Sequence, residues 1–378
     1  MFPSGIPLEE QNMISKTDTI VLFEDDQRFG KTIEAAIRAS LPSDFRLARF
    51  ESKLLQTSFL RPYEDTIREE LSRREYSNIA LIVSDRDLSK TDRYTGLSEA
   101  IISKVAAELG VPICLYARGC SDSVLDRQRS WGDGRIILDS ESPEHMASRV
   151  RLLAEGFVAI RGSIQKVLAL RGAKRPRTPA AVMAHIVAHE ELVDKIALYG
   201  SGDQKMVAEI LPFAIKRNVA EFKRRLPCLL GYWLYDSILR FPGLLVNGTA
   251  AASYLDIKVT TFENNKEIQD VFKSALYRGP FATDREPAWW RGQLDDLLMQ
   301  AKCIDGRSLV EKKLGRSVDF CPCSANRKIK AGYYCVATKQ PVSLDNSKGN
   351  ISWFPPGADL ARIRNDVYDE MGPWLGLY

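Results

Sequence analysis

Carboxylate side chains directly follow two apolar stretches of this sequence. Residues 19–23 (Thr-Ile-Val-Leu-Phe) lead into Glu-Asp-Asp at 24–26, and residues 79–83 (Ile-Ala-Leu-Ile-Val) lead into Ser-Asp-Arg-Asp at 84–87. Unbroken apolar runs of this length are typical of parallel strands that are buried on both faces. The carboxyl ends of such strands meet at one edge of the sheet, where open α/β folds bind their ligands. Carboxylate oxygens are the ligands that Mg²⁺ prefers, so the pattern predicts a site for Mg²⁺ and phosphate chemistry.

Residues 17–152 alternate between strand-like and helix-like segments. We expect strands at 19–23, 46–50, 79–84, 111–116 and 135–138, and helices at 28–39, 62–74, 96–109 and 143–157. Repeated strand–helix units of this kind fold into a doubly wound parallel sheet with helices on both faces. We therefore predict an α/β domain with five parallel strands.

The rest of the chain has a different character. We expect a polar tail at 1–16, a helix and basic linker at 153–179, a mostly helical output domain at 180–302 and a small mixed α/β part, rich in β structure, at 303–378. The four cations within 171–179 would contact nucleic acid or other phosphate groups, or would form a solvated hinge. The sequence has no Ser–His–Asp arrangement, P-loop or dinucleotide-binding glycine motif, so whether the second half is an enzyme stays open.

The composition has an ordinary balance of apolar and charged residues. The 378 residues include 53 basic and 49 acidic side chains, and the net charge of +4 does not by itself indicate nucleic-acid binding. The longest apolar runs are too short to cross a membrane, and the first residues lack the pattern of a signal peptide. Seven irregularly spaced cysteines fit free thiols better than a disulfide framework. We expect a two-domain cytoplasmic protein that has no membrane partner.

Several segments of the first part share a pattern with a known family. They are Phe-Glu-Asp-Asp at 23–26, Asp85 at the end of the third strand, Val-Pro-Ile-Cys-Leu-Tyr-Ala-Arg-Gly at 111–119, and Arg-Ile-Ile-Leu-Asp-Ser-Glu-Ser-Pro-Glu-His at 135–145. With these segments, residues 17 to about 152 resemble the receiver domain of bacterial two-component response regulators. The two acidic segments are further apart than in the family, which indicates an insertion near residues 51–65.

The resemblance implies a receiver fold, which is flavodoxin-like, and a switch that works by phosphorylation. Glu24 and Asp25 would hold Mg²⁺, Asp85 would be the phosphoacceptor, and the backbone carbonyl of Asp87 would complete the metal shell. A carboxylate nucleophile needs a divalent cation to neutralise the incoming phosphoryl oxygens, so the set of residues is chemically reasonable. A sensor histidine kinase or another signalling protein would be the partner.

Two positions depart from the family pattern. The family has Ser or Thr after its fourth strand, where this chain has Tyr116, and it has Lys at the end of its fifth strand, where this chain has Asp139 or, with a shift of one residue, Leu138. Loss of the lysine makes a phosphorylated Asp85 harder to stabilise. Either another cation replaces it, or the domain has stopped being phosphorylated. The candidate replacements are Arg86, Lys90 and Arg118.

His185 and His189 lie four residues apart on a predicted helix, with Glu190 and Glu191 directly after them. This spacing places both imidazoles on one helix face, where they could hold a metal. The segment around His189 also bears a faint similarity to the phosphorylated helix of histidine kinases, which would supply a phosphoryl donor. The third interpretation is an ordinary surface or packing pair.

Cys303, Cys321, Cys323 and Cys335 form the cysteine cluster of the C-terminal part. Four thiolates bind Zn²⁺ tetrahedrally, but the closely spaced pairs that mark structural zinc sites are missing here. Alternation of Cys321 and Cys323 along a strand fits a buried apolar role equally well. Zinc is therefore one of two interpretations.

These observations favour an atypical response-regulator-like signalling protein, in which the receiver-like domain controls the C-terminal output domain. Phosphorylation of Asp85, or binding of a partner, would change how the last strand and helix of the domain contact the output domain. Two alternatives stay open. One is a phospho-independent pseudo-receiver that acts as a scaffold or a DNA-associated regulator, and the other is an effector enzyme within residues 180–378. The sequence also leaves open whether the protein forms a homodimer.

Overall fold

The computed structural model describes residues 17–50, 62–88, 97–116, 135–138, 142–321 and 331–375. Its first part contains one sheet with the strands β1 (Asp18–Phe23), β2 (Phe45–Arg49), β3 (Ile79–Asp85), β4 (Ile113–Tyr116) and β5 (Arg135–Leu138). The strands lie in the order β2-β1-β3-β4-β5, and every neighbouring pair is parallel. The predicted α/β class with a parallel sheet is confirmed.

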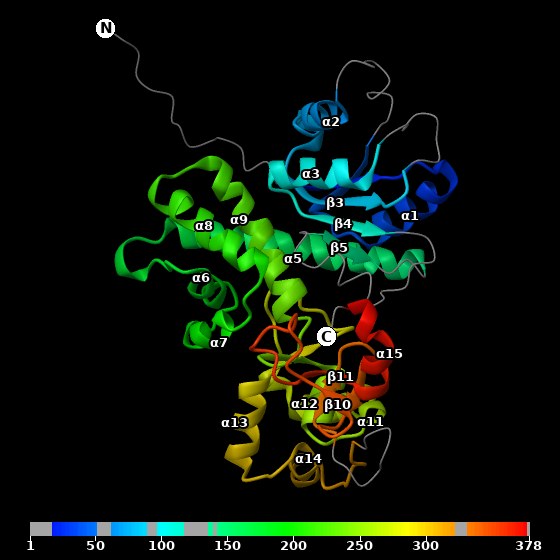
Figure 1. The fold of residues 1–378 in the computed structure, drawn as a ribbon, viewed down its shortest axis with the longest axis vertical. Coiled ribbons are helices and arrows are strands. Elements are labelled where there is room, and N and C mark those ends of the chain that lie inside the picture. Colours follow the sequence, from blue (N-terminus) through cyan, green and yellow to red (C-terminus); the bar gives the residue numbers. More distant parts are fainter. Residues whose placement is uncertain are drawn as a thin grey trace.

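Helices cover both faces of this sheet (Figure 1). They are α1 (Gln27–Ser40), α2 (Tyr63–Leu71), α3 (Glu99–Leu109) and α5 (Pro143–Ala169). Ile20 and Leu22 of β1 point into the core shared with α1 and α5, whereas Val21 and Phe23 point into the core shared with α2 and α3. The apolar run of β1 is therefore buried on both faces, as its sequence predicts.

The second part of the chain combines helices with two small sheets. Its helices are α6 (Pro179–Ile186), α7 (Val193–Ala197), α8 (Gly202–Lys216), α9 (Ala220–Tyr232), α10 (Gly248–Tyr254), α11 (Val259–Glu263), α12 (Lys266–Val271), α13 (Arg291–Ala301), α14 (Gly306–Leu314) and α15 (Asn365–Leu375), and its strands are β6 (Leu245–Asn247), β7 (Ala288–Trp290), β8 (Tyr333–Cys335), β9 (Gln340–Val342), β10 (Ser347–Lys348) and β11 (Ala361–Arg364). β6 pairs with β7, and the other four strands lie in the order β10-β11-β8-β9. Residues 350–354 form no strand, and α15 begins directly after β11.

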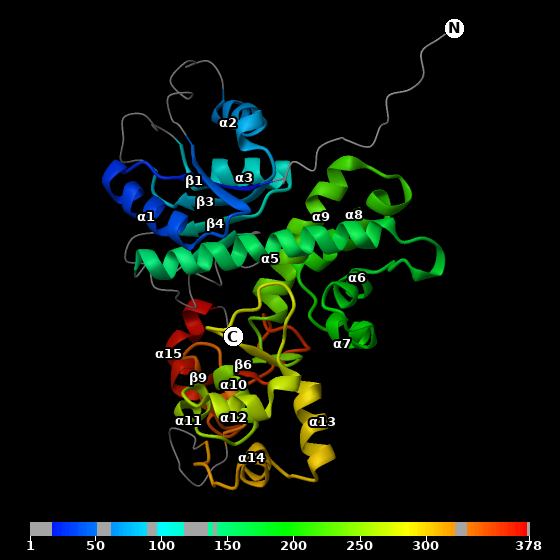
Figure 2. The same cartoon turned by 180° about the vertical axis from the view of Figure 1, so that it is seen from behind.

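α5 joins the two parts of the protein (Figure 2). Its 27 residues run along the sheet and continue beyond it to α8 and α9, so the helix crosses the boundary expected at residue 152 without a break. One cluster of buried side chains contains Ile20 of β1, Phe157 of α5 and Ile363 of β11. The two parts therefore share a continuous hydrophobic core.

α9 also contacts the first part directly. The buried hydroxyl of Tyr232 accepts a hydrogen bond from the Ile113 amide at 2.7 Å and donates one to the Ile113 carbonyl at 3.1 Å. Gly110 ends α3 with a φ of 66°, and a Cβ at this position would lie 2.9 Å from the carbonyl carbon of Arg224 on α9. These contacts fix α9 against the start of β4.

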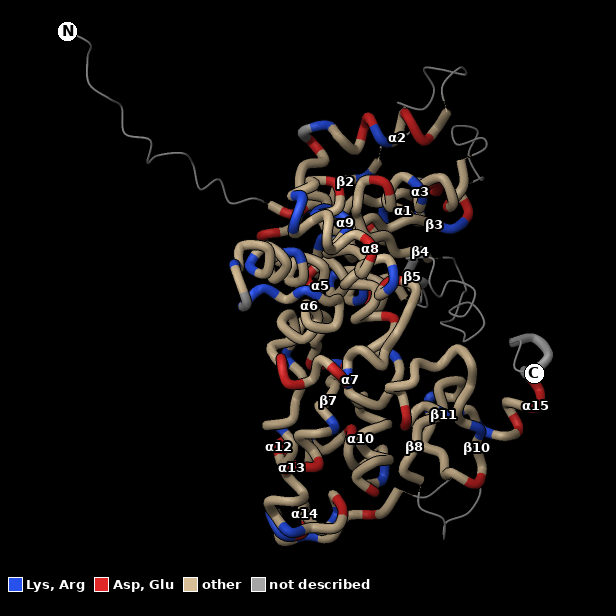
Figure 3. Tube along the Cα trace, turned by 60° about the vertical axis from the view of Figure 1, so that its left-hand side comes forward, with Lys and Arg blue, Asp and Glu red and all other residues tan. Residues whose placement is uncertain are grey.

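Basic and acidic residues are interspersed over both parts of the molecule (Figure 3). This distribution matches the nearly equal numbers of the two charge types, 53 and 49. Among the described helices, including the 27-residue α5, none combines the length and the hydropathy needed to span a bilayer.

We expect Gly110→Ala to lower the free energy of unfolding by about 2 kcal/mol, because a side chain at positive φ is strained and its Cβ would meet the α9 backbone. Gly162→Ala is the matched control. Gly162 lies inside α5 with nothing within 4 Å of an added Cβ, so alanine there should stabilise the protein by about 0.5–1 kcal/mol. Urea unfolding followed by circular dichroism measures both. Equal stability of the two variants would contradict the close packing of Gly110 on α9.

A second prediction concerns Asp203 in the first turn of α8. Burial raises the pKa of this carboxyl to about 7, and the charge of Asp236 adds to the rise. Because the folded chain holds the proton more tightly than the unfolded chain, the contribution of Asp203 to the free energy of unfolding should fall as the pH rises from 3.8 to about 7. Asp203→Asn should therefore gain up to about 4 kcal/mol over the wild type at about pH 8, less than half of that at about pH 5 and little at about pH 3. Urea unfolding at a series of pH values measures the free energy of unfolding of both proteins. If these free energies depend on pH in the same way, the prediction is wrong.

Candidate functional site

Three carboxylates meet at the carboxyl edge of the parallel sheet. Glu24 and Asp25 follow β1 directly, Asp85 is the last residue of β3, and these two strands are neighbours with Phe23 opposite Ser84. One ligand oxygen from each carboxylate lies within 4.8 Å of the others, and at most 3% of each residue is exposed. In the part of the chain that the structure describes, this is the only such cluster of three or more His, Cys, Asp or Glu side chains.

Backbone amides and one tyrosine orient these side chains. The amide of Asp26 donates to Glu24 Oε1 at 2.8 Å, and the hydroxyl of Tyr116 donates to Glu24 Oε2 at 2.6 Å. The amide of Asp87 donates to Asp85 Oδ1 at 3.0 Å. The turns that follow β1 and β3 therefore hold the carboxylates in fixed positions.

Burial and the neighbouring carboxylates disfavour the charged form of Glu24. Burial raises the pKa of Glu24 and the charges of Asp85 and Asp25 raise it further, whereas the hydrogen bonds from Tyr116 and the Asp26 amide oppose the rise. Burial also raises the pKa of Tyr116 well above its ordinary value, with a contribution from the charge of Glu24, so the tyrosine keeps its proton and remains a donor. A bound proton or divalent cation would relieve the repulsion among the carboxylates.

Tyr116 is the functional residue whose role sequence reasoning missed. It ends β4 opposite Asp85 of β3, and its side chain is fully buried. From this position its hydroxyl extends past β3 to Glu24 at the end of β1. The sequence marks Tyr116 only as a departure from Ser or Thr, because the contact with Glu24 depends on strand order and on the length of the side chain.

Arg49 is a cation next to the acidic residues that the sequence did not single out. It ends β2, and its Nη2 donates to the backbone carbonyl of Glu24 at 2.9 Å. Gly30 leaves room for this guanidinium, since an added Cβ would lie 2.9 Å from Nη2. Arg86, one of the expected replacements for the missing lysine, forms an ion pair with Glu99 at 3.3 Å. The other positions considered, Lys90, Arg118 and Asp139, lie outside the described residues.

The prediction that His185 and His189 share one helix face is wrong. α6 ends between them, and Ala188 adopts a φ of 58°, so His189 lies in the turn after the helix. Nδ1 of His185 lies 3.0 Å from Glu190 Oε1, and Nδ1 of His189 lies 2.6 Å from Glu191 Oε1. Each histidine contacts its own glutamate, and the pair belongs to no metal-ligand cluster of three or more among the described residues.

The cysteine cluster is not brought together by the described part of the fold. Cys321 and Cys335 are buried, Cys303 is half-buried, and Cys323 lies outside the described residues. The Sγ of Cys335 accepts hydrogen bonds from two backbone amides, at 3.3 and 3.5 Å. Because none of the three described cysteines belongs to a metal-binding cluster of described residues, the structure adds no support for zinc at this position.

The acidic cluster suits a hard divalent cation. Glu24, Asp25 and Asp85 supply only oxygen ligands from two adjacent strand ends, which is the donor set that Mg²⁺ prefers. The role of the Asp87 carbonyl as a further ligand stays a prediction. A scan against protein-family models finds no match to this sequence, and a search of the curated proteins finds none either. The chemistry of the site therefore rests on its geometry.

We expect the wild type to bind Mg²⁺ in isothermal titration calorimetry, and Asp25→Asn and Asp85→Asn each to weaken binding roughly tenfold or more through loss of a ligand charge. Asp26→Asn is the matched control, because the Asp26 carboxylate instead caps α1 by accepting from the amides of Arg28 and Phe29. Since the pKa of Glu24 is raised, affinity should also fall as the pH is lowered and protons compete with the metal. An equal loss of affinity in all three variants would argue against this cluster as the metal site.

Proposed function

We propose that residues 17–152 act as the receiver-like domain of a signalling protein, in which Asp85 accepts a phosphoryl group beside a bound Mg²⁺. The observation that carries the proposal is the buried cluster of Glu24, Asp25 and Asp85 at the carboxyl edge of a parallel sheet. The strand order β2-β1-β3-β4-β5 adds support, since it is the order of flavodoxin-like doubly wound folds. The phosphoryl donor would be a sensor histidine kinase or another phosphorylated signalling protein.

Phosphoryl transfer needs a nucleophile in a fixed position and a charge that offsets the phosphoryl oxygens. A carboxylate oxygen of Asp85 would attack the phosphorus atom and form an acyl phosphate, while the bond between phosphorus and the donor breaks. The amide of Asp87 orients the Asp85 carboxylate through its hydrogen bond to Oδ1. Glu24 and Asp25 would hold the Mg²⁺, which when bound neutralises charge on the phosphoryl group.

Tyr116 favours a second candidate function. Its hydrogen bond to Glu24 Oε2 competes with a metal for that oxygen, and its buried ring lies next to Asp85 at the edge of the sheet. In a phospho-independent pseudo-receiver, this bond would hold Glu24 permanently, and the domain would act as a scaffold for a protein partner. The two functions differ in whether Tyr116 releases Glu24.

β4 provides a route from the acidic cluster to the second part of the protein. Tyr116 lies at its carboxyl end, and Ile113, three residues earlier and about 10 Å away, makes the two backbone hydrogen bonds with Tyr232 of α9. A shift of β4 that follows a change at Tyr116 would therefore alter the contact with α9. The output, either a protein interaction or an effector activity, would reside in residues 180–378.

Incubation with Mg²⁺ and acetyl phosphate, followed by intact-protein mass spectrometry, tests the proposed function. The wild type should gain one phosphoryl group and Asp85→Asn should gain none. Tyr116→Phe should gain it several-fold faster, because the loss of the hydroxyl frees Glu24 Oε2 for the metal. Asp26→Asn, which alters an acidic residue outside the cluster, should behave like the wild type.

Phosphorylation of Asp85→Asn would show that the acceptor is another residue. If the wild type gains nothing under conditions that modify an established receiver domain, whereas Tyr116→Phe does, Tyr116 blocks the site and the scaffold function is supported. No gain in either protein would contradict phosphorylation at Asp85 altogether.

A further inference from the structure

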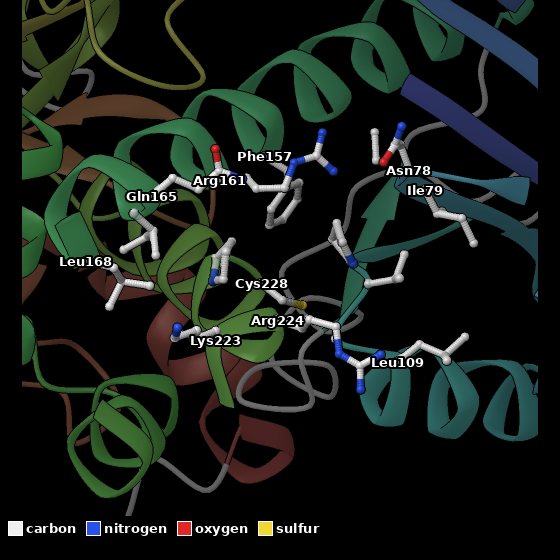
Figure 4. A pocket seen from close by; sticks show the side chains of 16 residues that line it. Asn78, Ile79, Leu109, Phe157, Arg161, Gln165, Leu168, Lys223, Arg224 and Cys228 are labelled. Carbon is white, nitrogen blue, oxygen red and sulfur yellow. The ribbon is translucent and has the colours of Figure 1, made fainter. Parts of the chain in front are cut away.

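A cavity of about 550 Å³ lies between the two parts of the protein, at the sheet edge opposite the acidic cluster. The end of α3 and residues at the amino ends of β3 and β4 form one side of it, and α5 and α9 form the rest (Figure 4). Its volume lies within the range of sites that hold small organic molecules. The cavity shares no residue with the Glu24, Asp25 and Asp85 cluster.

Most of the wall of this cavity is apolar. Ile79 and Leu109 come from the first part of the chain, and Phe157 and Ile164 come from α5. The ring of Phe157 is fixed by edge-to-face contacts with two further aromatic rings. A large apolar surface is therefore already formed before any ligand binds, which reduces the cost of ordering it on binding.

The polar part of the wall is positively charged. The 16 described lining residues include three cations and no acidic side chain. Arg161 of α5 forms an ion pair with Asp18, whereas Lys223 of α9 hydrogen-bonds to the neutral side chain of Asn218. Neither Lys223 nor Arg224 forms an ion pair with another described residue. Figure 4 shows Arg161 on one side of the cavity and these two α9 cations on the other.

We propose that this cavity binds a small organic anion with an apolar body and one carboxylate or phosphate group. The body would lie against Phe157 and Ile164, and the anionic group would lie near Lys223 and Arg224. Because both parts of the chain supply its wall, the bound anion would contact both and stabilise their association. This proposal goes beyond the receiver-like function and does not depend on phosphorylation of Asp85.

The fluorescent anion 8-anilinonaphthalene-1-sulfonate is a suitable probe, because it joins an apolar ring system to one sulfonate. We expect the full-length protein to bind it with enhanced fluorescence, and the double variant Lys223→Gln/Arg224→Gln to bind it roughly tenfold more weakly through loss of two charges. The matched control is Lys205→Gln/Lys216→Gln, which removes two exposed lysines of α8 outside the cavity and should bind like the wild type. Melting curves by circular dichroism check that both variants are folded.

A second variant and two competitors locate the probe and identify the type of ligand. Leu168→Trp, which enlarges a lining side chain of α5 without changing charge, should reduce binding of the probe. Displacement by decanoate would indicate an apolar carboxylate as the ligand, and displacement by adenosine monophosphate would indicate a phosphate. Equal affinity of the probe for the wild type and the double variant would overturn the proposal. Unchanged binding in Leu168→Trp, or displacement by neither competitor, would overturn it as well.

Discussion

The main constraint on the first part of the structure is that three carboxylates lie close together and are buried. Glu24, Asp25 and Asp85 are almost fully buried, so their mutual repulsion is screened poorly. The fold meets this constraint with two strands that end side by side, with backbone amides and with the hydroxyl of Tyr116. Buried ionisable groups that lie close to one another concentrate at functional sites. This tendency is the physical reason to expect a functional site at Glu24, Asp25 and Asp85.

Glu24 has two possible partners at this edge of the sheet, the hydroxyl of Tyr116 and a metal cation. In the observed arrangement, the hydroxyl of Tyr116 donates a hydrogen bond to Glu24 Oε2. If a cation displaces the hydroxyl from that oxygen, Tyr116 would need another acceptor, and its buried ring would move within a packed environment that includes Phe29. Packed elements of this kind change between discrete arrangements, and β4 carries any such change to Ile113 and its bonds with Tyr232. In the proposed function, the hydrogen bond between Tyr116 and Glu24 is the feature on which switching would depend.

The sheet and the acidic cluster could be predicted because both follow from local sequence patterns. Unbroken apolar runs identify buried strands, and adjacent ends of parallel strands must bring their carboxylates together. Prediction failed where a distant contact or a single backbone conformation decides the outcome. The contact between Tyr116 and Glu24 depends on strand order and side-chain length, and His189 leaves its helix because the chain adopts a positive φ at Ala188. Neither feature is visible in hydrophobic periodicity.

The acidic cluster and the proposed anion cavity lie at opposite edges of one sheet, and β4 connects the two edges. β4 begins beside the cavity and ends at Tyr116, and α9 supplies Tyr232 and two of the three cavity cations, Lys223 and Arg224. An anion that holds α9 against the sheet would favour the state of β4 in which Ile113 keeps its bonds to Tyr232. Linkage would make the effect reciprocal: binding at the acidic cluster that weakens those bonds would lower the affinity for the anion, and the anion would lower the affinity of the acidic cluster by the same factor. The two sites would then communicate through the stability of one shared contact, without any direct interaction between their ligands.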